Sequence, residues 1–268
     1  MRKTALAFMA LAAMVSCATK QTEPQALVLY YSQTNSTKAV AEEIALQTGA
    51  DIVAFDVEQP YDGTYQETIM RGMQERSSGE FPKLAELGCD LSKYDVIYLG
   101  YPIWYGTYAI PVSSLLAEVD FSGKTIIPFC TFGSGGLQSS SADLKAALPG
   151  ADIREGYGVR AARIDKAKAE VEQFLIRSGL IEGEAIALPE FSAQQPITEA
   201  EAAIFDAACS SYPMPLGTPV TVGSRSIPNG TEYLFTAESM GADGTPSKAC
   251  IYVTAEEGSA PEFTQAVR

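Results

Sequence analysis

Six uncharged polar residues stand between an apolar run and a segment with helical periodicity. They are Ser32, Gln33, Thr34, Asn35, Ser36 and Thr37. Hydroxyl groups can donate to phosphate oxygens, the first N–H groups of a helix attract an anion, and Asn35 tolerates the left-handed backbone of a tight anion-binding turn. The stretch therefore predicts a phosphate site without a basic residue; the alternative is a simple helix cap, which needs only one or two of these side chains. It matches neither GxxxxGK[ST] nor GxGxxG, which argues against a nucleoside triphosphatase and a dinucleotide site.

Two later loops suit a flat heterocycle. Residues 101–111 contain Trp104, the only tryptophan, with three tyrosines and two prolines. Aromatic side chains in a loop can stack on a planar ring, although packing back on a sheet is the alternative. Residues 130–140 contain Gly133, Gly135 and Gly136, which allow the backbone to approach a ligand closely. Three such loops after successive strands predict a ligand site more strongly than any one of them.

Alternating strand-like and helical segments position these loops. Apolar runs predict strands at 26–31, 51–56, 95–100, 125–130 and 153–159. Helical patterns lie at 36–49, 64–77, 109–119, 139–148 and 164–179. The alternation predicts an α/β fold over residues 26–181, with a doubly wound, five-stranded parallel sheet. In such sheets ligands bind at the carboxyl ends of the strands, where all three loops are expected.

Residues 26–180 resemble a flavodoxin-like, FMN-binding domain. Three motifs carry the resemblance in the family's order and spacing: YYSQTNSTKAVAEEIA, DVIYLGYPIWYGTYAIP and TIIPFCTFGSGGLQSS. The second is similar to the loop of a bacterial branch of the family. The resemblance implies FMN as the cofactor, with its phosphate held by residues 32–37; the family often has Gly where Asn35 stands, and Asn can adopt the same turn.

The same resemblance implies which residues line the flavin ring. One side would be formed by Pro102, Ile103, Trp104, Tyr105 and Gly106, and the other by Thr131, Phe132, Gly133 and Gly135. Gly106 would supply the peptide that contacts flavin N5.

The C-terminal part predicts a second, smaller domain. Two prolines mark a linker at 182–197, and Thr198 and Glu201 match a capping box at the start of a helix that extends to Tyr212. Strand-like runs follow at 218–227, 231–239 and 247–256, so residues 198–268 are expected to form a helix on an antiparallel sheet.

This domain weakly resembles the cystatin fold. Residues 226–230 align with the inhibitory signature Gln-x-Val-x-Gly, but Ser226 and Pro228 replace its Gln and Val. The resemblance therefore favours a structural or docking domain over a protease inhibitor.

The N-terminus predicts export and a lipid anchor. Arg2 and Lys3 precede a short apolar stretch, and MVSC resembles a lipoprotein box in which Cys17 is acylated. Residues 1–17 would be the signal peptide, with Cys17 as the lipidation site, and residues 18–25 a polar tether. The protein would then be anchored to a bacterial membrane and face the periplasm. An ordinary cleaved signal peptide is the alternative. Because only one arginine stands in the basic region, we expect the cofactor to be loaded after export.

Composition narrows the range of functions. The formal net charge of −14 disfavours nucleic acid as a partner and favours a redox protein with a basic docking surface. The chain has no histidine, which excludes His-based triads and most zinc sites, and no metal or catalytic residue is predicted. Cys89, Cys130, Cys209 and Cys250 show no CxxC spacing, so free thiols and disulfides both stay open.

Three functions follow. The first is a membrane-tethered FMN protein that carries electrons between redox partners. The second is an FMN-dependent NAD(P)H:quinone-type oxidoreductase with a small electron acceptor, for which no distinct NAD(P)H motif is visible. The third is a non-redox binding lipoprotein on the same scaffold.

Overall fold

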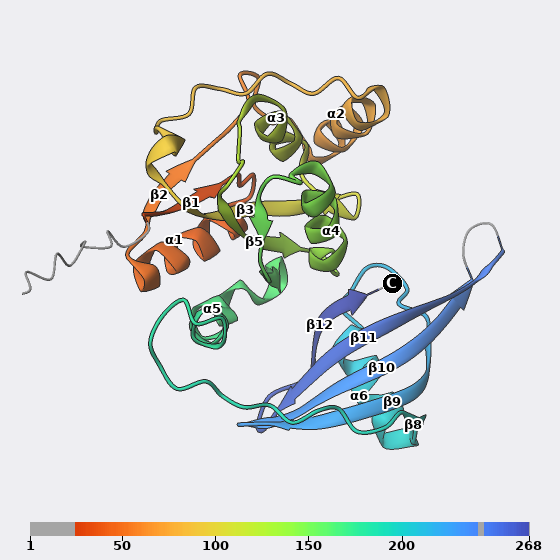
Figure 1. The fold of residues 1–268 in the computed structure, drawn as a ribbon. Coiled ribbons are helices and arrows are strands. Elements are labelled where there is room, and N and C mark those ends of the chain that lie inside the picture. The colour runs from red at the N-terminus through yellow and green to blue at the C-terminus, as the bar shows by residue number, and fades with distance from the viewer. Residues whose placement is uncertain (1–24, 241–243, 268) are drawn as a thin grey trace, which may run out of the picture.

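The computed structural model describes residues 25–240 and 244–267, which form two parts joined by an extended linker (Figure 1). The predicted signal peptide and Cys17 lie outside the described residues. Among the residues described, none of the helices combines the length and apolar character needed to cross a bilayer.

A parallel sheet is the centre of the first part. Its strands are β1 (Ala26–Tyr30), β2 (Asp51–Ala54), β3 (Val96–Trp104), β5 (Thr125–Phe132), β6 (Asp152–Ile153) and β7 (Tyr157–Arg160), with β4 (Thr107–Tyr108) antiparallel to the end of β3. The order is β2-β1-β3-β5-β6. β7 pairs with the same edge of β5 as β6 does, but nearer the carboxyl end of β5. The direction of the chain connections reverses between β1 and β3, the switch point at which ligands bind in open α/β sheets. The predicted fold class is confirmed.

The expected fifth strand is divided in two. β6 pairs with Thr125 and Ile126, whereas β7 pairs with β5 from Phe129 onward. Pro128 lies between these two segments and has no N–H to donate to a neighbouring strand. Gly156 packs against it, since a Cβ there would lie 2.3 Å from the Pro128 carbonyl oxygen. The prediction of one continuous strand at 153–159 was therefore wrong, because Pro128 in the partner strand β5 lies where the pairing is interrupted.

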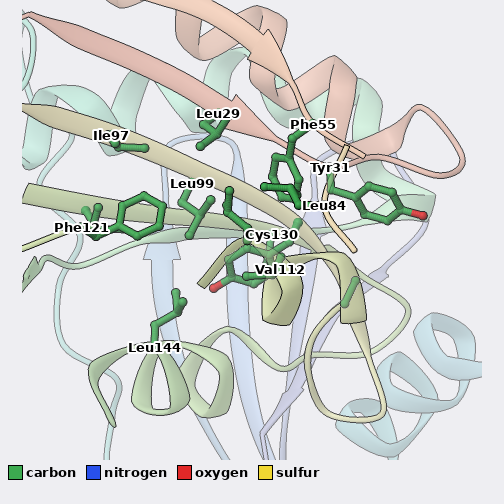
Figure 2. Close-up of a cluster of buried hydrophobic side chains, with 14 of the residues drawn as sticks. Leu29, Tyr31, Phe55, Leu84, Ile97, Leu99, Val112, Phe121, Cys130 and Leu144 are labelled. Carbon is green, nitrogen blue, oxygen red and sulfur yellow. The ribbon is translucent and has the colours of Figure 1, made fainter. Parts of the chain in front are cut away.

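Helices cover both faces of the sheet. They are α1 (Ser36–Thr48), α2 (Tyr65–Ser78), α3 (Ile110–Glu118), α4 (Leu137–Ala147) and α5 (Ala167–Arg177), with short 3-10 helices η1 (Leu91–Lys93) and η2 (Ala161–Lys166). Alternate residues of β1 enter two different cores. Leu27 and Leu29 join the cluster that includes residues of α3 and α4. Figure 2 shows Leu29 in this cluster with Val112 of α3 and Leu144 of α4. Val28 packs in the cluster with α1 and α5, as expected for a strand buried on both faces.

The second part is a five-stranded antiparallel sheet with one helix. Helix α6 (Glu199–Cys209) begins with the predicted capping box of Thr198 and Glu201. The sheet order is β12-β11-β10-β9-β8, with strands β8 (Gln195–Pro196), β9 (Thr218–Ile227), β10 (Gly230–Met240), β11 (Pro246–Glu256) and β12 (Glu262–Val267).

The three predicted strands of this part are present, and the two edge strands β8 and β12 were not predicted. Phe205 of α6 and Phe235 of β10 meet in the core with their ring centroids 5.2 Å apart. The likeness to the cystatin fold stays a prediction.

Candidate functional site

The predicted loops meet at one cavity of about 870 Å³ at the carboxyl ends of β1, β3 and β5. The predicted residues that line it are Gln33, Thr34, Pro102, Ile103, Trp104, Tyr105, Thr131, Phe132 and Gly133. The cavity is at the large end of the range that holds a drug-sized ligand. Residues from three separate motifs therefore share one site.

A fourth wall was not predicted. It comes from the segment after β2 and the first turns of α2, with one residue from the start of η2. These residues are Tyr61, Asp62, Gly63, Tyr65, Thr68, Ile69 and Ala161. The sequence does contain a signal for this segment. It follows a parallel strand, so it must begin at the same edge of the sheet as the other loops.

The first loop has the backbone of an anion site. Asn35 precedes α1 in the left-handed conformation, at φ 64°, and its side chain makes no cap hydrogen bond. The Ser32 hydroxyl accepts from the Lys38 backbone N–H at 3.2 Å, and Thr34 Oγ1 lies 3.4 Å from Ser36 Oγ. The first turn of α1 contains no acidic side chain. The positive end of the helix is thus free of an internal carboxylate and favours an anion.

Two residues of this loop are turned toward other protein groups. The Gln33 amide donates to Tyr61 O at 2.8 Å and to Thr68 Oγ1 at 3.1 Å. Thr37 is buried, and its hydroxyl shares a 2.8 Å hydrogen bond with the hydroxyl of Thr131. Gln33 therefore joins the first loop to the fourth wall, and Thr37 joins it to the end of β5.

The aromatic wall is a set of edge-to-face contacts. The ring of Trp104 lies 5.0 Å from that of Tyr61 and 6.0 Å from that of Tyr31, at interplanar angles of 79° and 87°. The Tyr61 hydroxyl donates to Glu75, and Arg71 lies over the Tyr61 ring at 3.9 Å. Burial, and then the contact with Glu75, raises the pKa of Tyr61, so its hydroxyl stays protonated. The aromatic rings of this wall therefore carry no charge.

The second loop is a strand followed by a tight hairpin. β3 continues to Trp104, and Tyr105 and Gly106 turn the chain into β4 with φ of 54° and 84°. Two consecutive residues at positive φ are typical of a two-residue hairpin turn. The Tyr105 hydroxyl donates to Ile69 O at 2.7 Å and so joins the hairpin to α2. The segment 101–111, predicted as a loop after the third strand, is partly regular, because Tyr101 and Pro102 pair with β5 and Ile103 and Trp104 pair with β4.

The other predicted residues lie around the large cavity and do not line it. Ser32, Asn35, Ser36 and Thr37 form the turn and first residues of α1. Gly106 and Gly135 line a second cavity of about 200 Å³ near the start of α4, where Gly106 O accepts from the Ser139 hydroxyl at 2.5 Å. The assignment of Gly106 to flavin N5 stays a prediction.

Among the described residues, no group of three or more Cys, Asp or Glu side chains is arranged to hold a metal ion. Cys130 is fully buried beneath the third loop, and burial raises the pKa of its thiol. The four described cysteines are free thiols. The site combines a turn whose backbone suits an anion with a cavity lined in part by aromatic side chains.

Comparisons with known proteins agree with this fold. The sequence model of the flavodoxin family matches residues 25–174. A search of curated proteins finds no match. A crystal structure of a putative flavoprotein from Bacteroides uniformis is 27% identical, with a TM-score of 0.50, and the match covers 56% of this chain and 98% of that one.

Two further solved structures are similar over the same share of the chain. A putative flavoprotein from Bacteroides eggerthii is 23% identical, with a TM-score of 0.49 and coverage of 59% of this chain and 99% of that one. A flavoprotein in complex with FMN from Lactobacillus acidophilus is 23% identical, with a TM-score of 0.46 and coverage of 53% and 97%. The family match ends before the linker, so the C-terminal part lies outside it.

Proposed function

We infer the function from one premise: the chain belongs to the flavodoxin family. We propose that it binds FMN in the cavity of about 870 Å³ and carries electrons between redox partners. The observation that carries the proposal is the meeting of Thr34, Trp104 and Phe132, one from each predicted loop, at this single cavity. A bound FMN would supply reversible uptake and release of electrons.

The residues present suit each part of the cofactor. The hydroxyls of Thr34 and Ser36 and the N-terminus of α1 would hold the phosphate, since they offer donors without a competing carboxylate. Trp104 and Phe132 would pack on the ring, and Gly133, which has no other group within 4 Å of an added Cβ, would let it approach the backbone. Tyr61 and Tyr105 would exclude water from its edge.

The binding test compares FMN with riboflavin, which lacks the phosphate. Purified protein should show a flavin absorbance spectrum, or gain one when FMN is added to the apoprotein. A T34A/S36A double variant should lose affinity for FMN and keep its affinity for riboflavin, whereas W104A should weaken both. S178A, at the exposed end of α5, is the control and should change neither. A colourless protein that does not take up FMN would refute the redox function and leave a non-redox binding role.

A kinetic experiment separates the carrier from the reductase. The carrier should exchange electrons with a reduced redox protein and should oxidise NADPH or NADH slowly, with or without an added quinone. Rapid, saturable NAD(P)H oxidation that depends on the quinone would instead establish the FMN-dependent oxidoreductase.

We also propose that the chain is exported and held on a bacterial membrane by acyl chains on Cys17, facing the periplasm. The support is the MVSC box after a short apolar stretch. A C17S variant should lose incorporation of labelled fatty acid and leave the membrane fraction. Unchanged labelling of C17S would contradict the anchor.

A further inference from the structure

The C-terminal part of the chain contacts the third loop of the site directly. The Ala266 N–H, in β12, donates to Ser134 O at 2.5 Å. A Cβ placed on Gly135 would lie 2.1 Å from Ala266 O. β12 can therefore lie against this loop only because residue 135 has no side chain. The contact is made by backbone atoms, which are not free to move away as a flexible side chain would be.

Arg160 connects the same loop to the C-terminal part from a second direction. Its backbone pairs with Phe132 at the end of β5. Its Nε donates to Gly133 O at 2.8 Å, and its Nη1 donates to Phe263 O at 2.7 Å. The guanidinium also lies 4.3 Å from the centre of the Phe263 ring. One side chain thus bridges Gly133, which lines the large cavity, and Phe263, the second residue of β12.

Ion pairs fix the position of the two parts beside this bridge. Arg163 is buried, and it pairs with Glu262 and Glu170 at 3.0 Å each. Lys166 pairs with Glu256 at 3.0 Å. If the C-terminal part shifted, Arg163 would keep Glu170 of α5 but lose Glu262, and Lys166 would lose Glu256, so these pairs favour one docked position over a sliding contact.

We propose that the C-terminal domain is a support for the cofactor loop, with Arg160 as the positioning residue, and that docking of the domain and binding of FMN strengthen each other. Gly133, Gly135 and Gly136 give the undocked loop more freedom than other residues would. Docking removes part of this freedom before the cofactor binds, which raises affinity by preorganisation. The coupling is reciprocal, so the cofactor stabilises the docked domain by the same factor. The inference rests on the proposed binding of FMN.

The first test measures the affinity of the full-length apoprotein for FMN by titration of flavin fluorescence. R160M removes both hydrogen bonds and keeps most of the aliphatic length. Arg154, whose contact with Asp152 is on the surface, gives the matched control R154M. We expect R160M to bind FMN at least about fivefold more weakly than the wild type, and R154M to bind as the wild type does. Equal affinity of R160M and R154M would overturn the inference and leave the proposed function intact. Failure of the wild type to bind FMN would defeat both.

The second test uses a different variant and a readout on the domain itself. A266P removes the N–H that donates to Ser134 O and places the proline ring against that oxygen, on the outer side of the edge strand β12. It should weaken FMN binding as R160M does, with an unchanged far-UV circular dichroism spectrum. In the wild type, FMN should slow hydrogen exchange of the amides of β12, and in A266P this effect should be lost. Exchange in β12 that does not respond to FMN in the wild type would contradict the coupling.

Discussion

Gly100 shows how a single residue sets the spacing of the sheet below the site. It pairs with Phe129 across β3 and β5, and a Cβ at position 100 would lie 2.1 Å from the Phe129 ring. The ring is fully buried and has little room to move. Position 100 therefore requires glycine because of its packing against Phe129 and not because of its backbone conformation.

G100A should lower the free energy of unfolding by about 1–3 kcal/mol, the usual effect of overpacking a core. Urea denaturation of the apoprotein measures it. Gly88 has nothing within 4 Å of an added Cβ, so G88A is the control and should change stability by much less. Equal effects of the two variants would show that the Phe129 ring moves aside.

The buried hydrogen bond between Thr37 and Thr131 is a second residue-level test. T37V or T131V alone should reduce stability by about 1–3 kcal/mol, because each leaves a buried hydroxyl without a partner. The double variant T37V/T131V should be more stable than the sum of the single changes predicts, since it removes both hydroxyls. A double-mutant cycle in urea measures this coupling, and additive effects would contradict it.

At the scale of elements, α2 is the least anchored helix near the cavity. Gly72 is its only residue classed as buried, and Tyr65, Met70 and Met73 are each more than half exposed. Its position depends on polar contacts, among them those of Tyr105 with Ile69 and of Gln33 with Thr68. Elements held in this way open at lower free energy than packed core elements.

The capping box of α2 should control its local stability. The Thr64 hydroxyl accepts from the Glu67 N–H, and the Glu67 carboxylate accepts from the Thr64 N–H at 2.7 Å. T64A should destabilise the helix by about 1 kcal/mol, seen as faster hydrogen exchange within 65–78. T198A, in the equivalent capping box of α6, is the matched control and should leave exchange in α2 unchanged.

The same cap gives a pH dependence with a definite sign. The hydrogen bonds from Thr64 lower the pKa of Glu67 below its usual value. A carboxyl whose pKa is lower in the folded state stabilises that state above its unfolded pKa, and the stabilisation is lost as pH falls through the folded pKa. Protection of α2 amides, corrected for intrinsic exchange, should therefore decrease in acid more in the wild type than in E67Q. Equal decreases would exclude Glu67 as the cause.

Most elements could be predicted from local patterns, and the exceptions have a tertiary cause. β9 spans the predicted residues 218–227, since its turn residues and β-branched pattern are local signals. The division of the fifth strand depends on Pro128 in the neighbouring strand β5, which no local pattern of residues 153–159 contains. β12 is a short edge strand, and its pairing with β11 decides its structure.

The site, like the fold, could be predicted where local motifs exist and not where tertiary contacts decide the structure. The loops after β1, β3 and β5 carry distinctive residue types, and residues of all three line the large cavity. The segment around Tyr61 has no such motif, and only its place after β2 indicates a role. The orientation of Gln33 toward Tyr61 and Thr68 depends on residues distant in the sequence, so composition alone could not predict it.

At the scale of the whole molecule, charge is the property most relevant to the proposed electron transfer. The net charge of −14 opposes the addition of electrons to a bound flavin and so lowers its reduction potential. Added salt screens this repulsion, because the Debye length falls from about 30 Å at 0.01 M to about 10 Å at 0.1 M.

The midpoint potential of the FMN-loaded protein should therefore rise between 0.01 M and 0.1 M salt. Spectroelectrochemical titration at fixed pH measures it, with free FMN in the same buffers as the control for effects of the medium. A potential that shifts no more than that of free FMN would show that the surface charge does not act on the cofactor.

The direction of β1 places the cavity at the end of the strand that is farther from the predicted anchor. The strand begins at Ala26, and the first loop of the site follows its other end at Tyr30. In a chain anchored through Cys17, the predicted tether at 18–25 and the length of the strand, about 17 Å, would both lie between the acyl chains and the cavity. That separation would let an electron donor or acceptor that diffuses in water reach the cavity.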